Sequence, residues 1–275
     1  MFVLKTSIYD SKLLGFQNFT SLALALSCSA TSFFKYNFFL NISIMKSLKT
    51  TARLTGLGYL IIFISGFFAN FYTLESMVVD GHALLTSINI INQFSQFQMG
   101  LIAFSIMVIV DIILAFPLYR LLKNESERLA TTSSILRLIN GAIFAIALFS
   151  LFEIASLAAN SPQDLAGDVE RLLAQFNMVW NIGLLFFGAH LLLLGLLIFR
   201  SASFPQIIGV LLQIAGIAYL MDSGAQLFLS NYKDYQSLFE MLVISGGVIG
   251  EFSLTLFLLI KGLRFKKSST PQLAI

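Results

Sequence analysis

Long apolar stretches separated by short polar segments dominate this chain. A helix needs about 20 apolar residues to cross the ~30 Å hydrocarbon core of a bilayer. Six stretches reach that length: 54–73, 99–120, 135–158, 178–199, 206–229 and 239–260. Each is too long for a buried strand, and backbone in lipid must satisfy its own hydrogen bonds. The pattern therefore predicts an all-α bundle of six transmembrane helices.

Two connecting segments carry helical patterns of their own. In 164–177 the apolar residues at helical spacing are Leu165, Val169, Leu172, Leu173 and Phe176. In 82–97 they are Leu84, Leu85, Ile88, Ile91 and Phe94. Such one-sided patterns are typical of helices that lie in a membrane surface. We therefore expect two amphipathic helices on the outer surface or over the mouth of the bundle.

The composition narrows the class of protein. Hydrophobic residues make up 57 % and charged residues 11 % of the 275 residues, whereas a soluble domain has about 25 % charged residues. This excludes an ordinary soluble enzyme and a disordered chain. The one cysteine, Cys28, cannot close an intrachain disulfide or build a multi-thiolate metal site.

The positions of the cations predict an orientation. One side of the predicted bundle collects Lys35, Lys46, Lys49, Arg53, Arg120, Lys123, Arg128, Arg137, Arg200, Lys261, Arg264, Lys266 and Lys267. The alternate loops hold only Arg171 and Lys233. Because cytoplasmic loops are enriched in Lys and Arg, both termini are predicted to be cytoplasmic. The net charge of +3 is then explained by cations that orient the spans beside anionic lipid. No nucleic-acid partner is needed to explain it.

The chain divides into three parts by composition. Residues 1–44 are rich in Phe, Ser and Asn without helical periodicity, and Met45 stands directly before the first span. We expect 1–44 to be a weakly ordered arm or a non-native upstream extension. Residues 45–263 form the six-span domain, and 264–275 form a basic cytoplasmic tail.

Five ionisable residues interrupt the predicted spans. Asp111, His190 and Glu251 lie near span centres, and Glu153 and Asp222 lie in the outer thirds. An acid at a helix centre costs ~2.5–3.5 kcal/mol on insertion, so we expect all five to face the interior as a polar core. Asp111, His190 and Glu251 are expected at similar depth and close together. This core either binds a cation, a proton or a small polar ligand, or holds the helices together.

The order of polar residues suggests an internal repeat. Arg53, Arg137 and Gln206 open three successive outward spans, and Asn70, Glu153 and Asp222 follow them after 17, 16 and 16 residues. This predicts three helical hairpins of one design, as occurs in transporters. The alternative is coincidence, because every six-span protein has cations at its inner ends.

Enzyme signatures are mostly absent. There is no H-E-x-x-H or G-x-S-x-G motif, and the chain has only two histidines. We therefore predict no catalytic residue, cofactor or metal site. The leading hypothesis is a protein that binds, senses or moves a cation, a proton or a small solute through the polar core. The alternatives are a membrane-embedded enzyme using His190 with a carboxylate, and a structural or accessory protein.

Several segments resemble a known family. They are RLTGLGYLI at 53–61, LYRLLK at 118–123, RLINGAI at 137–143, NIGLLFFGAHLLLLGLLIF at 181–199, FPQIIGVLLQIAGIAYLMDS at 204–223 and GEFSLTLFLLIKG at 250–262. In these the chain is similar to the bacterial multi-pass membrane family known as domain of unknown function 4386. The resemblance implies six or seven spans in the bacterial cytoplasmic membrane. It brings no catalytic residues and no established activity.

Overall fold

The computed structural model describes residues 48–261. The predictions for 1–44 and 264–275 therefore lie outside the described residues. The described chain is all helical, and it contains six helices that are long and apolar enough to cross a membrane, which confirms the six predicted spans.

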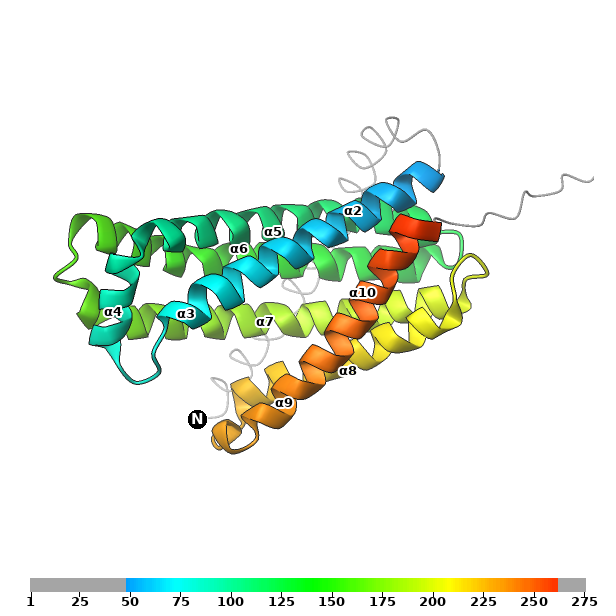
Figure 1. Ribbon diagram of the computed structural model, residues 1–275. Helices are drawn as coiled ribbons and strands as arrows, with labels where there is room; N and C mark the ends of the chain where they lie inside the picture. The colour runs from blue at the N-terminus through cyan, green and yellow to red at the C-terminus, as the bar shows by residue number, and fades with distance from the viewer. Residues whose placement is uncertain (1–47, 262–275) are drawn as a thin grey trace, which may run out of the picture. The chain divides into compact units, whose positions relative to one another are not determined.

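The first two spans begin and end as follows (Figure 1). The first is α2 (Leu48–Phe67), which continues through the π-helical η2 (Phe68–Leu74) into α3 (Glu75–Met77). The short helix α4 (Ala83–Asn92) leads into the second span, α5 (Phe94–Leu122). Both spans extend beyond their predicted ends because polar residues at each terminus still complete helical turns.

The other spans follow in antiparallel order (Figure 1). They are α6 (Glu127–Asn160), α7 (Leu165–Arg200), α8 (Gln206–Phe228), and a last span built of α9 (Gln236–Val243), η4 (Ile244–Val248), α10 (Ile249–Leu256) and η5 (Phe257–Lys261). A short 3₁₀ helix, η3 (Tyr232–Asp234), precedes α9. Ser126 caps α6, where its hydroxyl accepts from Leu129 N–H at 3.5 Å, and Pro205 precedes α8 with the φ of −64° that proline imposes. These short connections make sequence neighbours pack side by side.

The six spans close into a ring. Each of α5, α6, α7 and α8 packs on the next, α2 packs on α5, and the last span packs on both α8 and α2. At the end of the ring that is predicted to be cytoplasmic, Ser201 donates a 2.8 Å hydrogen bond to Glu125, which joins two loops. Figure 1 shows α2 and α10 converging at that end and diverging away from it.

The prediction of a separate surface helix over 164–177 is wrong. These residues form the first turns of the 36-residue α7. Leu165, Val169 and Leu172 are fully buried, because the stripe packs against the apolar cluster of α4, α5 and α6 and not against lipid. An amphipathic pattern shows which face is covered but not whether lipid or protein covers it.

The second connecting segment does form a short separate helix. α4 packs mainly on α7, with Thr86, Ser87 and Ile90 on its buried face. The predicted apolar stripe faces outward, and Leu84 is 64 % exposed. The predicted helix is thus present but ends at Asn92, and polar side chains turn inward.

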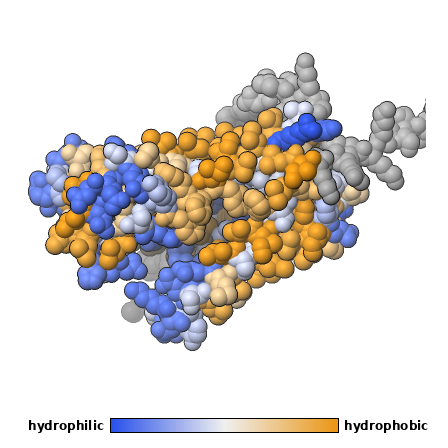
Figure 2. Space-filling view, in the orientation of Figure 1, coloured by the Kyte–Doolittle hydropathy of each residue, from blue (hydrophilic) through white to orange (hydrophobic). Residues whose placement is uncertain are grey.

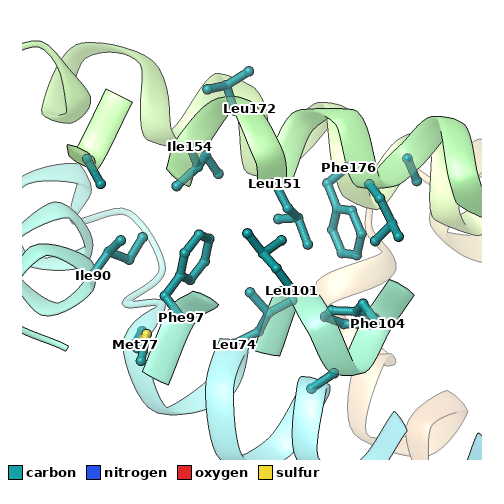
Figure 3. Packing of buried hydrophobic residues seen from close by; sticks show 14 of the residues in the cluster. Leu74, Met77, Ile90, Phe97, Leu101, Phe104, Leu151, Ile154, Leu172 and Phe176 are labelled. Carbon is teal, nitrogen blue, oxygen red and sulfur yellow. The ribbon is translucent and has the colours of Figure 1, made fainter. Parts of the chain in front are cut away.

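A continuous apolar core fills the half of the bundle next to α4 (Figure 3). Phe97, Leu101 and Phe104 of α5 interleave with Leu151 of α6 and Phe176 of α7. The Phe104 and Phe176 rings meet edge to face with centroids 5.8 Å apart. This close packing forms a rigid wall beside the polar residues that lie nearer the middle of the bundle.

Glycines let α7 and α8 touch along their backbones. A Cβ built on Gly209 would lie 2.6 Å from the Gly195 carbonyl oxygen, and one built on Gly216 would lie 2.8 Å from the Gly188 carbonyl oxygen. Small residues at such contacts are how helices approach closely in membranes. This seam fixes the spacing of α7 and α8 and so positions the polar residues that they carry.

Candidate functional site

Each of the six spans contributes one polar side chain to the middle of the ring. They are Tyr59 on α2, Asp111 on α5, Arg137 on α6, His190 on α7, Tyr219 on α8 and Glu251 on α10. Tyr219 is half-buried, and the other five are at most 7 % exposed. Because an unpaired polar group is costly inside a membrane protein, six ionisable or phenolic side chains at this level need hydrogen-bond or charge partners.

The centre of the cluster is a buried ion pair. Arg137 Nη2 lies 2.6 Å from Asp111 Oδ1, and Arg137 Nε donates at 3.0 Å to the Asp111 backbone carbonyl. The second carboxylate oxygen of Asp111 accepts from Asn140 Nδ2 at 3.0 Å. Both oxygens of Asp111 are therefore occupied, and the pair joins α5 to α6.

The same guanidinium also reaches α2 and α7. Arg137 Nη1 donates to the Tyr59 hydroxyl at 3.0 Å and lies 3.0 Å from His190 Nε2. His190 Nδ1 lies 2.8 Å from the Ser133 carbonyl oxygen. A carbonyl only accepts, so Nδ1 carries the proton and Nε2 accepts from Arg137, which makes the imidazole neutral. Arg137 thus links four helices as one hydrogen-bonded hub.

The interpretation of Arg137 as one of the cations that mark the cytoplasmic ends of the spans is wrong. Its side chain is 1 % exposed and lies inside the ring. A signal was present: Asp111 lies 12 residues before Lys123 and Arg137 lies 11 residues after Ser126, so an antiparallel α5–α6 pair brings them level. Of the 17 cations in the chain, which include Lys5 and Lys12 of the N-terminal segment, 15 were assigned to the predicted cytoplasmic side, and removing Arg137 leaves 14 of 16.

Glu251 stands apart from this hub. Its carboxylate oxygen Oε1 accepts from the Tyr219 hydroxyl at 3.4 Å, a long hydrogen bond. Within residues 48–260, Glu251 forms no salt bridge with a cationic side chain. Of the three residues expected to converge, Asp111 and His190 meet through Arg137, whereas Glu251 shares only a cavity with Asp111.

That cavity lies inside the ring, on the side where α2 and α10 diverge. Its volume is about 340 Å³, and its walls include Asp111, Glu251, Tyr219, Trp180 and Asn70. Pockets for small ligands have volumes of about 300–1,000 Å³. Figure 2 shows the face between α2 and the last span hollowed, with apolar residues over much of its surroundings.

Asp222 and Glu153 lie away from the hub. Asp222 accepts from Tyr232 at 2.7 Å and from Gln226 at 2.9 Å. Burial, followed by the bond to Asp222, raises the pKa of Tyr232 above its ordinary value, so the phenol stays a donor. Asp222 is therefore buried as expected, but Gln226 is exposed and Tyr232 half-buried, and no hydrogen bond among the described residues joins this group to the hub.

The expectation that Glu153 faces the interior is wrong. Its side chain is 55 % exposed and lies 3.8 Å from Arg171, which is itself exposed. An ion pair at the end of a span can reach water, so the insertion penalty that predicted burial does not apply there. The repeat also loses support, because Arg137 is buried whereas Arg53 and Gln206 are exposed.

The arrangement suits binding better than chemistry at His190. Both ring nitrogens of His190 are engaged, and the residue is absent from the cavity walls. In the described part of the chain, no group of three His, Cys, Asp or Glu side chains is placed to hold a metal ion. What the cavity offers a ligand is a carboxylate, a phenol and an amide among aromatic rings.

Comparison with known proteins gives a family but no activity. Residues 54–262 match the family described as "Domain of unknown function (DUF4386)". An uncharacterized protein of Archaeoglobus fulgidus is 28 % identical over 173 residues, which cover 62 % of this chain and 90 % of that protein. No solved structure matches.

Proposed function

This chain belongs to the multi-pass membrane family DUF4386, whose description assigns no activity, and we propose that it binds a small cation in the cavity between its spans. Both the transport and the sensing of a cation or small solute require such a binding step. The observation that carries the proposal is the Glu251 carboxylate, buried, facing the cavity, and without a cationic partner among the described residues.

The charges of the polar cluster support Glu251, and not Asp111, as the carboxylate that binds the cation. The Arg137 guanidinium offsets the Asp111 carboxylate directly, and His190 is neutral by its hydrogen bonds. Ionised Glu251 therefore leaves the described cluster with one net negative charge, since Arg137 acts on it only at a distance and is already paired with Asp111. A buried charge is costly without a counter-charge, so a bound cation stabilises the folded state, and so would a proton.

The first test is a cation panel on the purified protein. We expect the melting temperature of the wild type to rise with at least one monovalent inorganic or organic cation chloride, by the linkage of ligand binding to folding. Glu251→Gln should remove this rise, because it removes the charge and keeps the shape. Glu153→Gln is the matched control, since that carboxylate is exposed, and it should keep the rise. No response to any cation, or an equal response in Glu251→Gln, would refute the proposal.

We further propose that the spans sit in a bacterial cytoplasmic membrane with both termini inside. Support comes from the 14 of 16 remaining cations on one side and from the apolar helix surfaces, such as Phe149 at 71 % and Ile260 at 73 % exposure, which match lipid as a solvent.

Cysteine labelling tests this orientation. In a Cys28→Ser background, cysteines at Asn124 and Ala202 should resist a membrane-impermeant maleimide added to intact cells. Cysteines at Gln163 and Lys233 should react. All four positions are exposed, so accessibility differs only by side of the membrane. The reverse pattern would overturn the orientation and leave the fold intact.

A further inference from the structure

We propose that the ligand of this cavity is an alkyl-substituted ammonium ion, with its charged nitrogen beside Glu251 and its apolar part directed to an opening between α2 and the last span. This inference rests on the proposed function and specifies its ligand. Three features of the cavity carry it: its aromatic walls, its small set of oxygen donors, and the position of its mouth.

Aromatic rings form much of the cavity wall. Of the seventeen lining residues in the described part of the chain, eight are aromatic, compared with 13 % of all residues in the chain. Phe187 and Tyr219 pack edge to face at 5.3 Å beside Glu251. Ring faces attract cations electrostatically, and cages of such rings recognise substituted ammonium groups. Phe187 already has one cation near its ring, with Arg137 Cζ 5.8 Å from the centroid.

The oxygen donors do not suit a bare metal ion. Hard cations take several oxygen ligands at short distance, but both carboxylate oxygens of Asp111 are occupied by Arg137 and Asn140. Among the described lining residues, Glu251 is the carboxylate that forms no ion pair. The cavity volume of about 340 Å³ corresponds to roughly ten waters at ~30 Å³ each, which is far more space than one ion fills. A larger organic cation fits both the size and the apolar lining.

The mouth of the cavity opens sideways, partway along two spans. Its rim includes Phe67, Phe71 and Val248, which are 66 %, 44 % and 48 % exposed. α2 and η5 close tightly at the predicted cytoplasmic end, where a Cβ on Gly56 would lie 3.0 Å from Leu258 and Leu259. Apolar residues exposed at this depth face hydrocarbon. A ligand with an alkyl group can therefore enter from the lipid and leave that group in the opening.

Both sides of the mouth are π-helical. Asn70 and Phe71 belong to η2, and Gly247 and Val248 belong to η4. Single turns of π-helix occur often at functional sites because they re-aim side chains locally. Here η2 and η4 lie on the two spans that border the mouth.

The chain carries its own reporter for the test. Trp180 is the one tryptophan of the sequence, and it lines the cavity, stacked on Phe144 at 3.7 Å. We would place the protein in nanodiscs of phosphatidylglycerol, which has no ammonium group, and titrate decyltrimethylammonium chloride while measuring Trp180 fluorescence. The expected result is a saturable change in the wild type, with half-saturation at least ten-fold higher in Glu251→Gln and unchanged in Glu153→Gln.

Matched probes separate charge from hydrophobicity. Decanesulfonate has the same chain with an anionic head and should give no saturable change. Choline should compete, whereas its neutral analogue 3,3-dimethylbutanol should not. Phosphatidylcholine added to the disc tests a lipid headgroup as the source: competition assigns the ammonium group to lipid, and lack of competition assigns it to a free amphiphile, both within the proposed class.

The contrary outcomes are distinct. An equal response of the wild type to decanesulfonate would overturn the inference, and this measurement needs no variant. Unchanged affinity for decyltrimethylammonium in Glu251→Gln would also overturn it. If sodium or potassium raises the melting temperature while every ammonium probe is inert, the ligand class is wrong but the proposed cation binding stands. If no cation acts by either readout, both fall.

Discussion

Replacing Arg137 with methionine should lower the free energy of unfolding by about 3–5 kcal/mol, the usual cost of removing one partner of a buried ion pair. Arg137 is 1 % exposed and bonds to α2, α5 and α7 at once. Without it, the Asp111 carboxylate, in a residue that is 5 % exposed, keeps only its bond to Asn140. Unfolding in mixed micelles, followed by circular dichroism, measures the loss.

Two companion variants separate this effect from a general loss of charge. Arg128→Met removes an exposed cation from the same helix and should change stability by less than about 0.5 kcal/mol. Adding Asp111→Leu to Arg137→Met should recover much of the loss, because it removes the orphaned carboxylate. If the loss in free energy of unfolding in the double variant equals the sum of the losses in the two single variants, Arg137 and Asp111 do not act as a coupled ion pair.

The second large effect is expected at the α7–α8 seam. Gly209→Val should cost about 3 kcal/mol, at the upper range for overpacking, because its Cβ would lie 2.6 Å from both the Gly195 carbonyl oxygen and the Phe199 backbone nitrogen. Backbone atoms cannot move aside as a flexible side chain does, so the helices must separate.

Gly224→Ala is the matched control for the seam. Gly224 lies in the same helix, and a Cβ there meets nothing within 4 Å. Alanine should be neutral or stabilising by up to about 1 kcal/mol through helix propensity. Equal destabilisation by both substitutions would show that α8 glycines matter for flexibility and not for contact.

Sequence reasoning located the six spans because their signal is strong: lipid requires about 20 apolar residues per helix. It placed Asp111 and His190 in the interior for the same reason, since a charge facing lipid is costly. It failed at the ends of spans, where Glu153 reaches water beside Arg171. It also failed for 164–177, because burial against protein and burial against lipid leave the same pattern.

Arg137 shows why the hub itself was not predicted. The positive-inside rule counts every cation near a span end, and Arg137 fitted that count. Only the pairing of α5 with α6 reveals that it lies level with Asp111. The cavity and its aromatic walls depend on where α2 and α10 diverge (Figure 1). This is a property of how the helices pack, and no local sequence pattern predicts it.

The most direct test of the account is the affinity of the cavity for a cation in wild type and Glu251→Gln, measured by isothermal titration calorimetry in phosphatidylglycerol nanodiscs with tetramethylammonium chloride. We expect one binding site per chain in the wild type and at least a ten-fold weaker site in Glu251→Gln, with both proteins folded because the Arg137–Asp111 pair is intact. Equal affinity in the two proteins would contradict the assignment of Glu251 as the group that binds the cation.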